Sequence, residues 1–480
     1  MANTAGTFDL AFPRCPANRT LTVWLYREIC GAIASGKLRP GTRLPSTREF
    51  ALQHGVSRGT VVTVFEQLHL DGYLRTGKGA GTWVDDRLPE RKPMPKRTLP
   101  RKATTYPGPM AGLRFLYPPR PFRLHDPAID LFPMREWARI AGRCLRHAPA
   151  AIMVGRDRLG FEPLRNAIAA YLGSSRGVAC TPDQIFVVSG VQQGLDLIAR
   201  LLLKPGQPAW IEDPGYFGAQ LAFRNAGAIL IPIPVDEHGM NPFLAQGKAK
   251  LAYLTPGHQF PTGVTMSPQR RFQVLAWARK SDCYLLEDDY DSEYRFENAP
   301  VPALQSLDDS GRVILVGSFN KFMFPALRIG YIVVPPPLVE PLATLRFGVD
   351  LNSFGIEQAI LSEFIEEGGL ARHLRRMREV YGARLAVLKQ CCKKYLRGAV
   401  ELSPARAGLF TPALLRNGLS SHQAEVAAAK QGVESMGLHR FCLKAKDPRG
   451  LLLGFGAFDE KRIREGTIAL ARAIDSAPQH

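Results

Sequence analysis

The chain has 480 residues, 45% of them hydrophobic, and its 62 Lys or Arg residues against 43 Asp or Glu residues give a net charge of +19. This length exceeds that of one small domain and predicts two, while no apolar run is long enough to form a membrane helix. The charge favours a polyanionic partner through counterion release, but basic enzymes also exist, so charge alone does not identify the partner.

The N-terminal residues and the cysteines bear on the cellular compartment. No basic stretch followed by an apolar one opens the chain, so no secretory signal is visible and we expect a cytoplasmic protein. The eight cysteines are scattered and form no Cys-x-x-Cys pair. This pattern indicates neither a disulfide framework nor a zinc site, so we expect no bound metal.

Three predicted helices and a hairpin follow one another near the N-terminus. Apolar residues recur at helical spacing from Leu21 to Gly36. Ser46, with Glu49 three residues later, predicts a capping box at the start of a second helix. Ser57 can cap a third helix, which completes a helix-turn-helix pattern. Two short strands around a glycine-rich tip between residues 72 and 84 then predict a wing.

Residues 21–84 resemble the winged helix of the GntR family, because helix, turn, recognition helix and wing occur in that family's order. The resemblance implies that the start of the recognition helix enters the major groove of double-stranded DNA, while the second helix and the wing touch the backbone. Gly59 stands where the family more often has a side chain. The alternative is a small helical domain with solvated arginines. The implied DNA contacts are Arg43, Ser46, Thr47, Arg48, Ser57, Arg58, Thr60, Lys78, Gly79 and Gly81.

Residues 85–124 differ in composition from both flanks. Ten Lys or Arg residues and nine prolines occur from Arg87 to Arg123, without helical or strand periodicity, which predicts an extended, semi-rigid linker. Its charge either keeps it solvated or places it along DNA phosphates, and the sequence does not choose. We therefore predict a DNA-binding domain at 1–84, the linker, and a second domain at 125–480.

Beyond the linker, apolar strands alternate with helices, which predicts an α/β domain. One strand is followed by a glycine turn and a helix, so the amides of Gly190, Val191 and Gln192 can bind phosphate at the helix start. Tyr216 follows another strand, where it can stack on a pyridine ring or simply pack in the core. A lone histidine such as His258 is more often structural than part of a site.

The most informative stretch begins with the apolar run 313–316. This run ends at Gly317-Ser318, so Lys321 should lie at the carboxyl end of a buried strand, where ligands bind in open α/β sheets. A lysine in an apolar pocket has a depressed pKa and can form a Schiff base, and Arg328 offers a planar fork for phosphate. A carbonyl-bearing phosphate ester suits both residues. An ordinary solvated pair on a loop is the alternative.

A second stretch, from Tyr284 to Tyr294, is another apolar strand that ends in carboxylates interleaved with tyrosines. A buried carboxylate needs a partner, and a protonated ring nitrogen can be that partner. Lys321 with Arg328, following Asp288 with Tyr290, resembles the fold-type I enzymes that use pyridoxal 5'-phosphate (PLP). Both stretches are similar to the MocR family, in which a GntR-type domain is fused to an aminotransferase-like domain.

This resemblance implies a fold-type I aminotransferase-like domain with a small C-terminal lobe, and a role for each residue. Lys321 forms the Schiff base, Asp288 pairs with the pyridine nitrogen and Tyr290 contacts the ring hydroxyl. An arginine of the C-terminal lobe, for which Arg440 is the candidate, holds the carboxylate of a small amino compound. A second subunit completes such sites, so a homodimer is implied. The implied cofactor residues are Lys321, Asp288, Tyr290, Arg328, Ser318, Gly190, Val191, Gln192, Tyr216 and His258.

The chain departs from the family pattern around the phosphate. Val191 stands where a hydroxyl residue is common, and Gly155 where a tyrosine usually reaches the neighbouring subunit's phosphate. Two donors are lost unless Arg156 or Arg158 replaces them, so we expect PLP to bind more weakly than in a typical aminotransferase. Other departures are Phe260-Pro-Thr-Gly263 for Asn-Pro-x-Gly, Asn320 for serine and Phe410 for histidine.

Three functions are compatible with these patterns. The first is a PLP-binding, DNA-binding transcription regulator that senses a small amine, an amino acid or PLP itself. The second is a working aminotransferase that carries an accessory DNA-binding domain. The third is a regulator whose second domain serves only for dimerisation.

Overall fold

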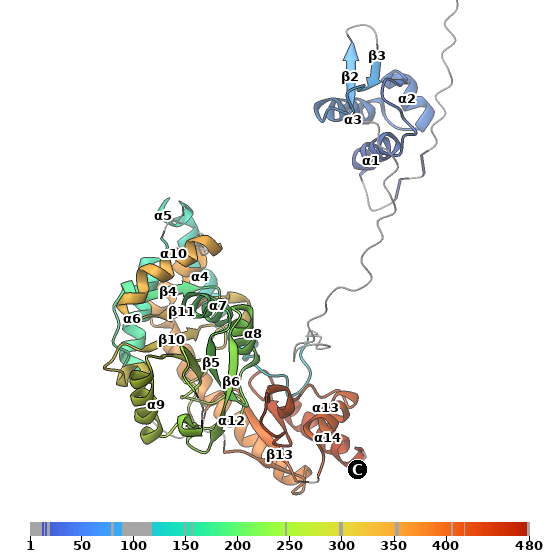
Figure 1. Cartoon of the computed structure of the whole chain (residues 1–480). Helices are drawn as coiled ribbons and strands as arrows, with labels where there is room; N and C mark the ends of the chain where they lie inside the picture. The colour runs from blue at the N-terminus through green and yellow to red at the C-terminus, as the bar shows by residue number, and fades with distance from the viewer. Residues whose placement is uncertain are drawn as a thin grey trace, which may run out of the picture. The chain divides into compact units, whose positions relative to one another are not determined.

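The computed structural model describes residues 12–13, 15–16, 20–77, 81–88, 118–147, 150–154, 157–244, 247–296, 301–350, 355–404, 407–416 and 418–477. The chain divides into two compact units, Met1–Tyr106 and Pro107–His480 (Figure 1). Each unit has a hydrophobic core of its own. Most of the predicted linker lies outside the described residues. So do Lys78, Gly79, Gly155 and Arg156.

The first unit is a winged helix-turn-helix, as predicted. Leu25, Phe50, Val61 and Leu68 are fully buried between its helices, because the apolar positions of each helix recur on one face. Its three-stranded antiparallel sheet has the order β1-β3-β2. The elements are α1 (Leu21–Ala34), β1 (Arg43–Leu44), α2 (Thr47–His54), α3 (Arg58–Leu70), β2 (Leu74–Gly77) and β3 (Gly81–Val84).

Both predicted helix caps are formed. The Ser46 hydroxyl accepts a hydrogen bond from the Glu49 N–H at 3.2 Å, and the Glu49 carboxylate accepts one from the Ser46 N–H at 2.9 Å. This reciprocal pair is a capping box and fixes the start of α2. At the start of α3, the Ser57 hydroxyl accepts a hydrogen bond from the Thr60 N–H at 3.1 Å. Gly55, with φ of 63°, ends α2 and lets the chain turn into α3.

The second unit is built on an eight-stranded mixed sheet of order β4-β11-β10-β9-β8-β5-β6-β7. β6, β5, β8, β9 and β10 are parallel, whereas β11 and β7 are antiparallel to their neighbours. The strands are β4 (Ile185–Val188), β5 (Pro208–Asp213), β6 (Ile229–Asp236), β7 (Gly239–Met240), β8 (Leu251–Leu254), β9 (Tyr284–Asp289), β10 (Val313–Ser318) and β11 (Gly330–Val333).

Helices cover both faces of this sheet. In β4, Ile185 and Val187 belong to one core and Phe186 and Val188 to another, because successive strand residues point to opposite faces. Residues of α6, α11 and α12 share the first core, and residues of α7, α8 and α10 share the second. The helices are α4 (Met134–Arg146), α5 (Ala150–Val154), α6 (Glu162–Arg176), α7 (Val191–Leu202), α8 (Phe217–Asn225), α9 (Pro268–Ser281), α10 (Val339–Asp350), α11 (Gly355–Glu366) and α12 (Gly369–Tyr395).

The C-terminal lobe is a four-stranded antiparallel sheet of order β12-β13-β15-β14. α14 packs against both α12 and α13, which joins the lobe to the rest of the unit. The elements are β12 (Val400–Leu402), β13 (Phe410–Leu415), α13 (Ser421–Lys430), β14 (Met436–Gly437), the 3-10 helix Leu438–Phe441, β15 (Gly450–Gly454) and α14 (Glu460–Ser476).

Residues 118–124 are a correction to the predicted linker, because they pack against the C-terminal lobe. Phe122 is fully buried, and its carbonyl accepts a hydrogen bond from the N–H of Gly454 in β15 at 3.0 Å. The Pro121 carbonyl accepts one from the Glu434 N–H at 2.9 Å. The composition of this stretch suggested a linker, but one phenylalanine with paired neighbours anchors it to the second unit.

Candidate cofactor site and DNA-binding surface

A cavity of about 330 Å³ lies at the carboxyl ends of β9 and β10. The two strands are parallel neighbours, so the side chains that follow them meet at one edge of the sheet. The structure brings together most of the residues that the sequence singled out for a cofactor. Those that line the cavity are Val191, Gln192, Tyr216, Asp288, Tyr290, Ser318, Lys321 and Arg328.

Lys321 follows β10 and lines this cavity. Its Nζ lies 4.0 Å from the centre of the Tyr290 ring. Desolvation by the surrounding protein lowers the pKa of the Lys321 amine, and the carboxylates of Asp291 and Asp288 oppose that shift. A lowered pKa leaves more of the amine neutral, and the neutral amine is the form that attacks a carbonyl.

Asp288, at the end of β9, presents a buried carboxylate to the cavity. Its Oδ2 accepts a hydrogen bond from the Tyr253 hydroxyl at 2.8 Å. Its Oδ1 is buried and has no hydrogen-bond partner within the part of the chain that the structure describes. Burial raises the pKa of Asp288 to about 7. A buried oxygen that lacks a donor fits a protonated pyridine nitrogen, so Asp288 suits the ring of PLP.

The start of α7 forms the anion-binding end of the cavity. Gly190 caps this helix with φ of 98°, and a Cβ there would lie 3.5 Å from the guanidinium carbon of Arg328. Arg328 therefore lies beside the free N–H groups of the helix start, and the two together suit a phosphate. The loop between β10 and β11, which carries Arg328, is held in place because the Asn320 side chain accepts a hydrogen bond from the Ile329 N–H at 3.2 Å.

The structure describes two of the four residues at which the sequence departs from the family pattern around the phosphate or could compensate for it. Val191 lines the cavity and brings no hydroxyl to the helix start. Arg158, which the sequence offered as a substitute donor, gives its NH1 to Glu340 at 3.0 Å instead. Gly155 and Arg156 are outside the described residues.

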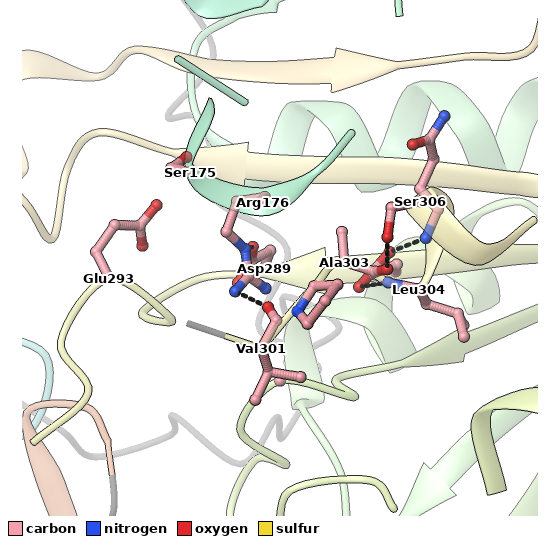
Figure 2. A network of polar contacts seen from close by, with 12 residues as sticks. Ser175, Arg176, Asp289, Glu293, Val301, Ala303, Leu304 and Ser306 are labelled. Carbon is pink, nitrogen blue, oxygen red and sulfur yellow. Dashed lines mark hydrogen bonds and ion pairs between the residues drawn. The ribbon is translucent and has the colours of Figure 1, made fainter. Parts of the chain in front are cut away.

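A buried polar network behind β9 holds the strand that carries Asp288. Figure 2 shows Arg176 directed at Asp289, with Glu293 nearby. Arg176 Nε lies 2.7 Å from Asp289 Oδ2, and both side chains are 2% exposed. Arg176 also donates to the Val301 carbonyl. Burial, reinforced by Asp289, raises the pKa of Glu293 to about 8. Asp289 and Asp288 are neighbours on one strand and point to opposite faces of it. The ion pair of Asp289 therefore also fixes the orientation of the Asp288 carboxylate.

His258 is buried beneath Tyr290 and does not line the cavity. Its Nδ1 lies 2.9 Å from Asp291 Oδ2 and 3.2 Å from the Tyr290 hydroxyl. The ring stacks on Phe410 with centroids 5.1 Å apart. His258 therefore positions Tyr290 and Asp291 from behind. Sequence reasoning did not assign Asp291, although the carboxylate cluster after β9 contained it.

Arg440 is not among the described residues that line the cavity, and its role towards an effector carboxylate stays a prediction. Its Nε lies 2.8 Å from both carboxylate oxygens of Glu425 in α13, whereas the next residue, Phe441, lines the cavity. The wall facing Lys321 is completed by segments that sequence reasoning missed. No periodicity or motif marks them, because they come from the junction between the predicted linker and the second domain and from the segment that runs into the start of β14. They are Arg123, Leu124, His125, Glu434, Ser435 and Met436.

The predicted DNA contacts of the first unit gather around the starts of α2 and α3. Arg58 is exposed in the first turn of α3, and Arg48 is exposed in the first turn of α2. The Ser57 and Thr60 hydroxyls lie 2.8 Å apart, so both take part in the cap of α3. A Cβ on Gly81 would lie 3.1 Å from Arg43 Nε, which places Arg43 against the wing strand.

No group of three His, Cys, Asp or Glu side chains suited to a metal ion occurs among the residues that the structure describes. Within those same ranges, no helix has the length and apolar character needed to cross a membrane.

Comparison with known proteins agrees with this geometry. Residues 21–84 match the gntR family of bacterial regulatory proteins, and residues 137–442 match aminotransferase class I and II. The probable rhizopine catabolism regulatory protein MocR of Rhizobium meliloti is 38% identical, over 94% of this chain and 93% of that protein. The pyridoxine biosynthesis regulator PdxR of Corynebacterium glutamicum is 31% identical, over 92% of this chain and 93% of its own length.

A solved relative extends the match to the cofactor. Pyrococcus horikoshii kynurenine aminotransferase, solved in complex with PMP, superimposes with a TM-score of 0.69 at 28% identity, covering 74% of this chain and 90% of that one. An aminotransferase fold with such a relative implies PLP as the cofactor. The chain therefore belongs to the MocR-type transcription regulators, in which a GntR-type DNA-binding domain precedes an aminotransferase-like domain.

Proposed function

We propose that this regulator binds PLP through Lys321 and changes its action on DNA when a small amino compound enters the same cavity. One observation carries the proposal: Lys321, the Arg328 guanidinium and an Asp288 Oδ1 that has no hydrogen-bond partner among the described residues share one cavity, in a chain that also carries a winged helix. PLP, when bound, supplies an aldehyde carbon that reacts with primary amines. An amine effector must then compete with Lys321 for that carbon.

The residues around the cavity each contribute one property to this proposal. Asp288 holds a proton on the ring nitrogen, because its Oδ1 lacks any other donor in the described ranges. Arg328 and the start of α7 hold the phosphate. Tyr290 covers the Lys321 amine at 4.0 Å and is itself held by His258.

A working aminotransferase is the second candidate, and the presence of Lys321 with Asp288 and Arg328 favours it. The two candidates differ in steady turnover. Incubating the PLP-loaded protein with common amino acids and 2-oxoglutarate, while following new amino acid over time, separates them. We expect at most a single exchange for each protein molecule, whereas sustained transamination would establish the enzyme.

DNA binding by the first unit is expected to depend on Arg58. Because this side chain is exposed at the start of α3, replacing it in Arg58→Ala should cost roughly 1–3 kcal/mol on the specific site if it reads a base. Arg27→Ala, which removes an exposed arginine from α1, is the matched control. Gel-shift titration with fragments upstream of the protein's own gene would measure both. Equal losses in the two variants would show that Arg58 contributes only charge.

We also propose a homodimer, formed by the end of the second unit that carries α5 and α10. Apolar side chains are exposed there: Met153 is 78% exposed, Val154 54% and Phe347 58%. We expect a second copy of the chain to bury these side chains, because a neighbouring subunit completes the site in the fold-type I enzymes that this domain resembles. Sedimentation should give about twice the chain mass.

Two variants test this surface. Phe347→Glu should shift the protein towards monomer, because a charge would be buried in the interface. Phe272→Glu on α9 replaces a similarly exposed phenylalanine elsewhere, 59% exposed, and should leave the mass unchanged. A wild-type monomer at micromolar concentration would contradict the proposal.

A further inference from the structure

Arg123 is a buried cation in the cavity wall that neither the sequence motifs nor the cofactor chemistry assign. Its side chain is 9% exposed, and it lines the cavity together with Lys321 and Asp288. Its Nε lies 2.7 Å from Asp126 Oδ2, and its NH1 lies 3.8 Å from Glu434 Oε2. The first distance is a close ion pair, whereas the second is at the outer limit of one. Arg123 is therefore held beside the cavity by carboxylates on two different segments.

The backbone on both sides holds Arg123 in this position. We call residues 118–125 the lead-in segment, because they precede the first helices of the second unit. Phe122 and His125 both have φ of 70°, a region costly for residues other than glycine, and it persists because the surroundings fix it. Phe122 is buried against β15, and the His125 ring lies 5.5 Å from that of Phe260.

Arg123 is one of the three Lys and Arg side chains that line the cavity within the described part of the chain. The other cations that line the wall in the described ranges are Lys321 and Arg328, and PLP binding engages both. His125 is not a further cation, because burial, aided by the nearby Lys321, holds its pKa well below the usual value. The carboxylate of Glu434 faces Arg123, and burial raises the pKa of Glu434. An acid group that replaces Glu434 would bring a better matched anion to the guanidinium.

We propose that Arg123, rather than Arg440, recognises an acid group of the effector. The effector is then a compound that carries both an amine and a carboxylate or sulfonate. This inference rests on the proposed function, since it assigns the second end of the same ligand. The acid group displaces Glu434 from Arg123 while the amine reaches the cofactor beside Lys321.

The location of Arg123 gives the regulator a physical route for its signal. Glu434 also accepts a hydrogen bond from the backbone N–H of Arg120 at 3.4 Å and donates its own N–H to the Pro121 carbonyl. Displacing its carboxylate therefore changes the hold on the lead-in segment, through which the chain passes towards the DNA-binding domain.

The test uses acid and amide pairs of equal size: glutamate with glutamine, 4-aminobutyrate with 4-aminobutyramide, and β-alanine with β-alaninamide. Each is titrated into the PLP-loaded full-length protein while the absorbance of lysine-bound PLP is followed. For the pair that binds best, the acid should bind at least about tenfold more tightly than the amide, because a charge-assisted fork is lost in the amide. In Arg123→Gln the acid and the amide should bind about equally, so the ratio of their affinities should fall to about one.

Three further variants sharpen the result. Arg440→Gln should keep the wild-type ratio, since that arginine is engaged with Glu425. Glu434→Gln should raise affinity for the acid several-fold, because it removes the competing carboxylate. Arg123→Lys, which keeps the charge without the fork, should retain part of the preference even if Arg123→Gln is too unstable to purify. An unchanged ratio in Arg123→Gln, or its loss in Arg440→Gln, would overturn the inference, as would a wild-type protein that does not prefer the acids.

An experiment without the cofactor tests this inference separately from the proposed function. Calorimetry of glutarate binding to the apo-protein requires the arginine but not PLP. If lysine-bound PLP never forms while glutarate binds in an Arg123-dependent way, the proposed function fails and the inference stands. If PLP is captured but neither glutarate nor the acid preference depends on Arg123, the inference fails and the proposed function stands.

Discussion

In a Lys321→Ala variant we expect no covalent capture of PLP, whereas the wild-type protein should yield a single borohydride-stable adduct on Lys321. Its amine has a pKa lowered by desolvation, so it is the lysine of the chain best placed to react inside the cavity. Titrating PLP into both proteins, reducing with borohydride and mapping the modified peptide by mass analysis would measure this. The expected effect is a complete loss of the adduct.

Two controls make the capture experiment specific. Lys204→Ala, which removes an exposed lysine after α7, should behave like the wild type. Asp288→Ala should still form the adduct but hold it more weakly, because the ring nitrogen then lacks its anionic partner. An adduct on another lysine, or none in wild-type protein at saturating PLP, would contradict the assignment of Lys321.

The sequence predicted the half of the site that lies on strand ends, and the reason is local. Lys321 follows, and Asp288 ends, an apolar run that predicts a buried strand, and parallel strands bring their carboxyl ends to one edge. The capping serines Ser46 and Ser57 were predictable for the same reason, since a cap is decided within four residues.

The other half of the cavity depends on contacts between distant segments. Arg123 sits among prolines and arginines that read as a linker, and nothing in that composition shows that Phe122 is anchored on β15. Arg440 was the candidate because it is an arginine of the C-terminal lobe. Its partner Glu425 lies on α13, and only the three-dimensional pairing reveals that Arg440 is engaged outside the cavity.

The largest stability effect is expected for Arg176→Met. This change leaves Asp289 as a buried carboxylate without its cation, and removing one member of a buried ion pair costs about 3–5 kcal/mol of unfolding free energy. Arg416→Met, which breaks the exposed pair with Glu401, is the matched control and should cost little. Denaturant unfolding of the second unit, followed by intrinsic fluorescence, would compare the two.

A double variant identifies the cause of that loss. In Arg176→Met with Asp289→Leu, the uncompensated carboxylate of Asp289 is removed as well, and apolar replacement of a whole buried pair is often neutral or stabilising. We therefore expect most of the lost stability to return, with PLP capture partly restored because Asp288 is held again on the neighbouring position of β9. If the double variant is as unstable as Arg176→Met alone, the loss comes from the other contacts of Arg176, such as its hydrogen bond to the Val301 carbonyl, and the ion pair is not what holds β9 in place.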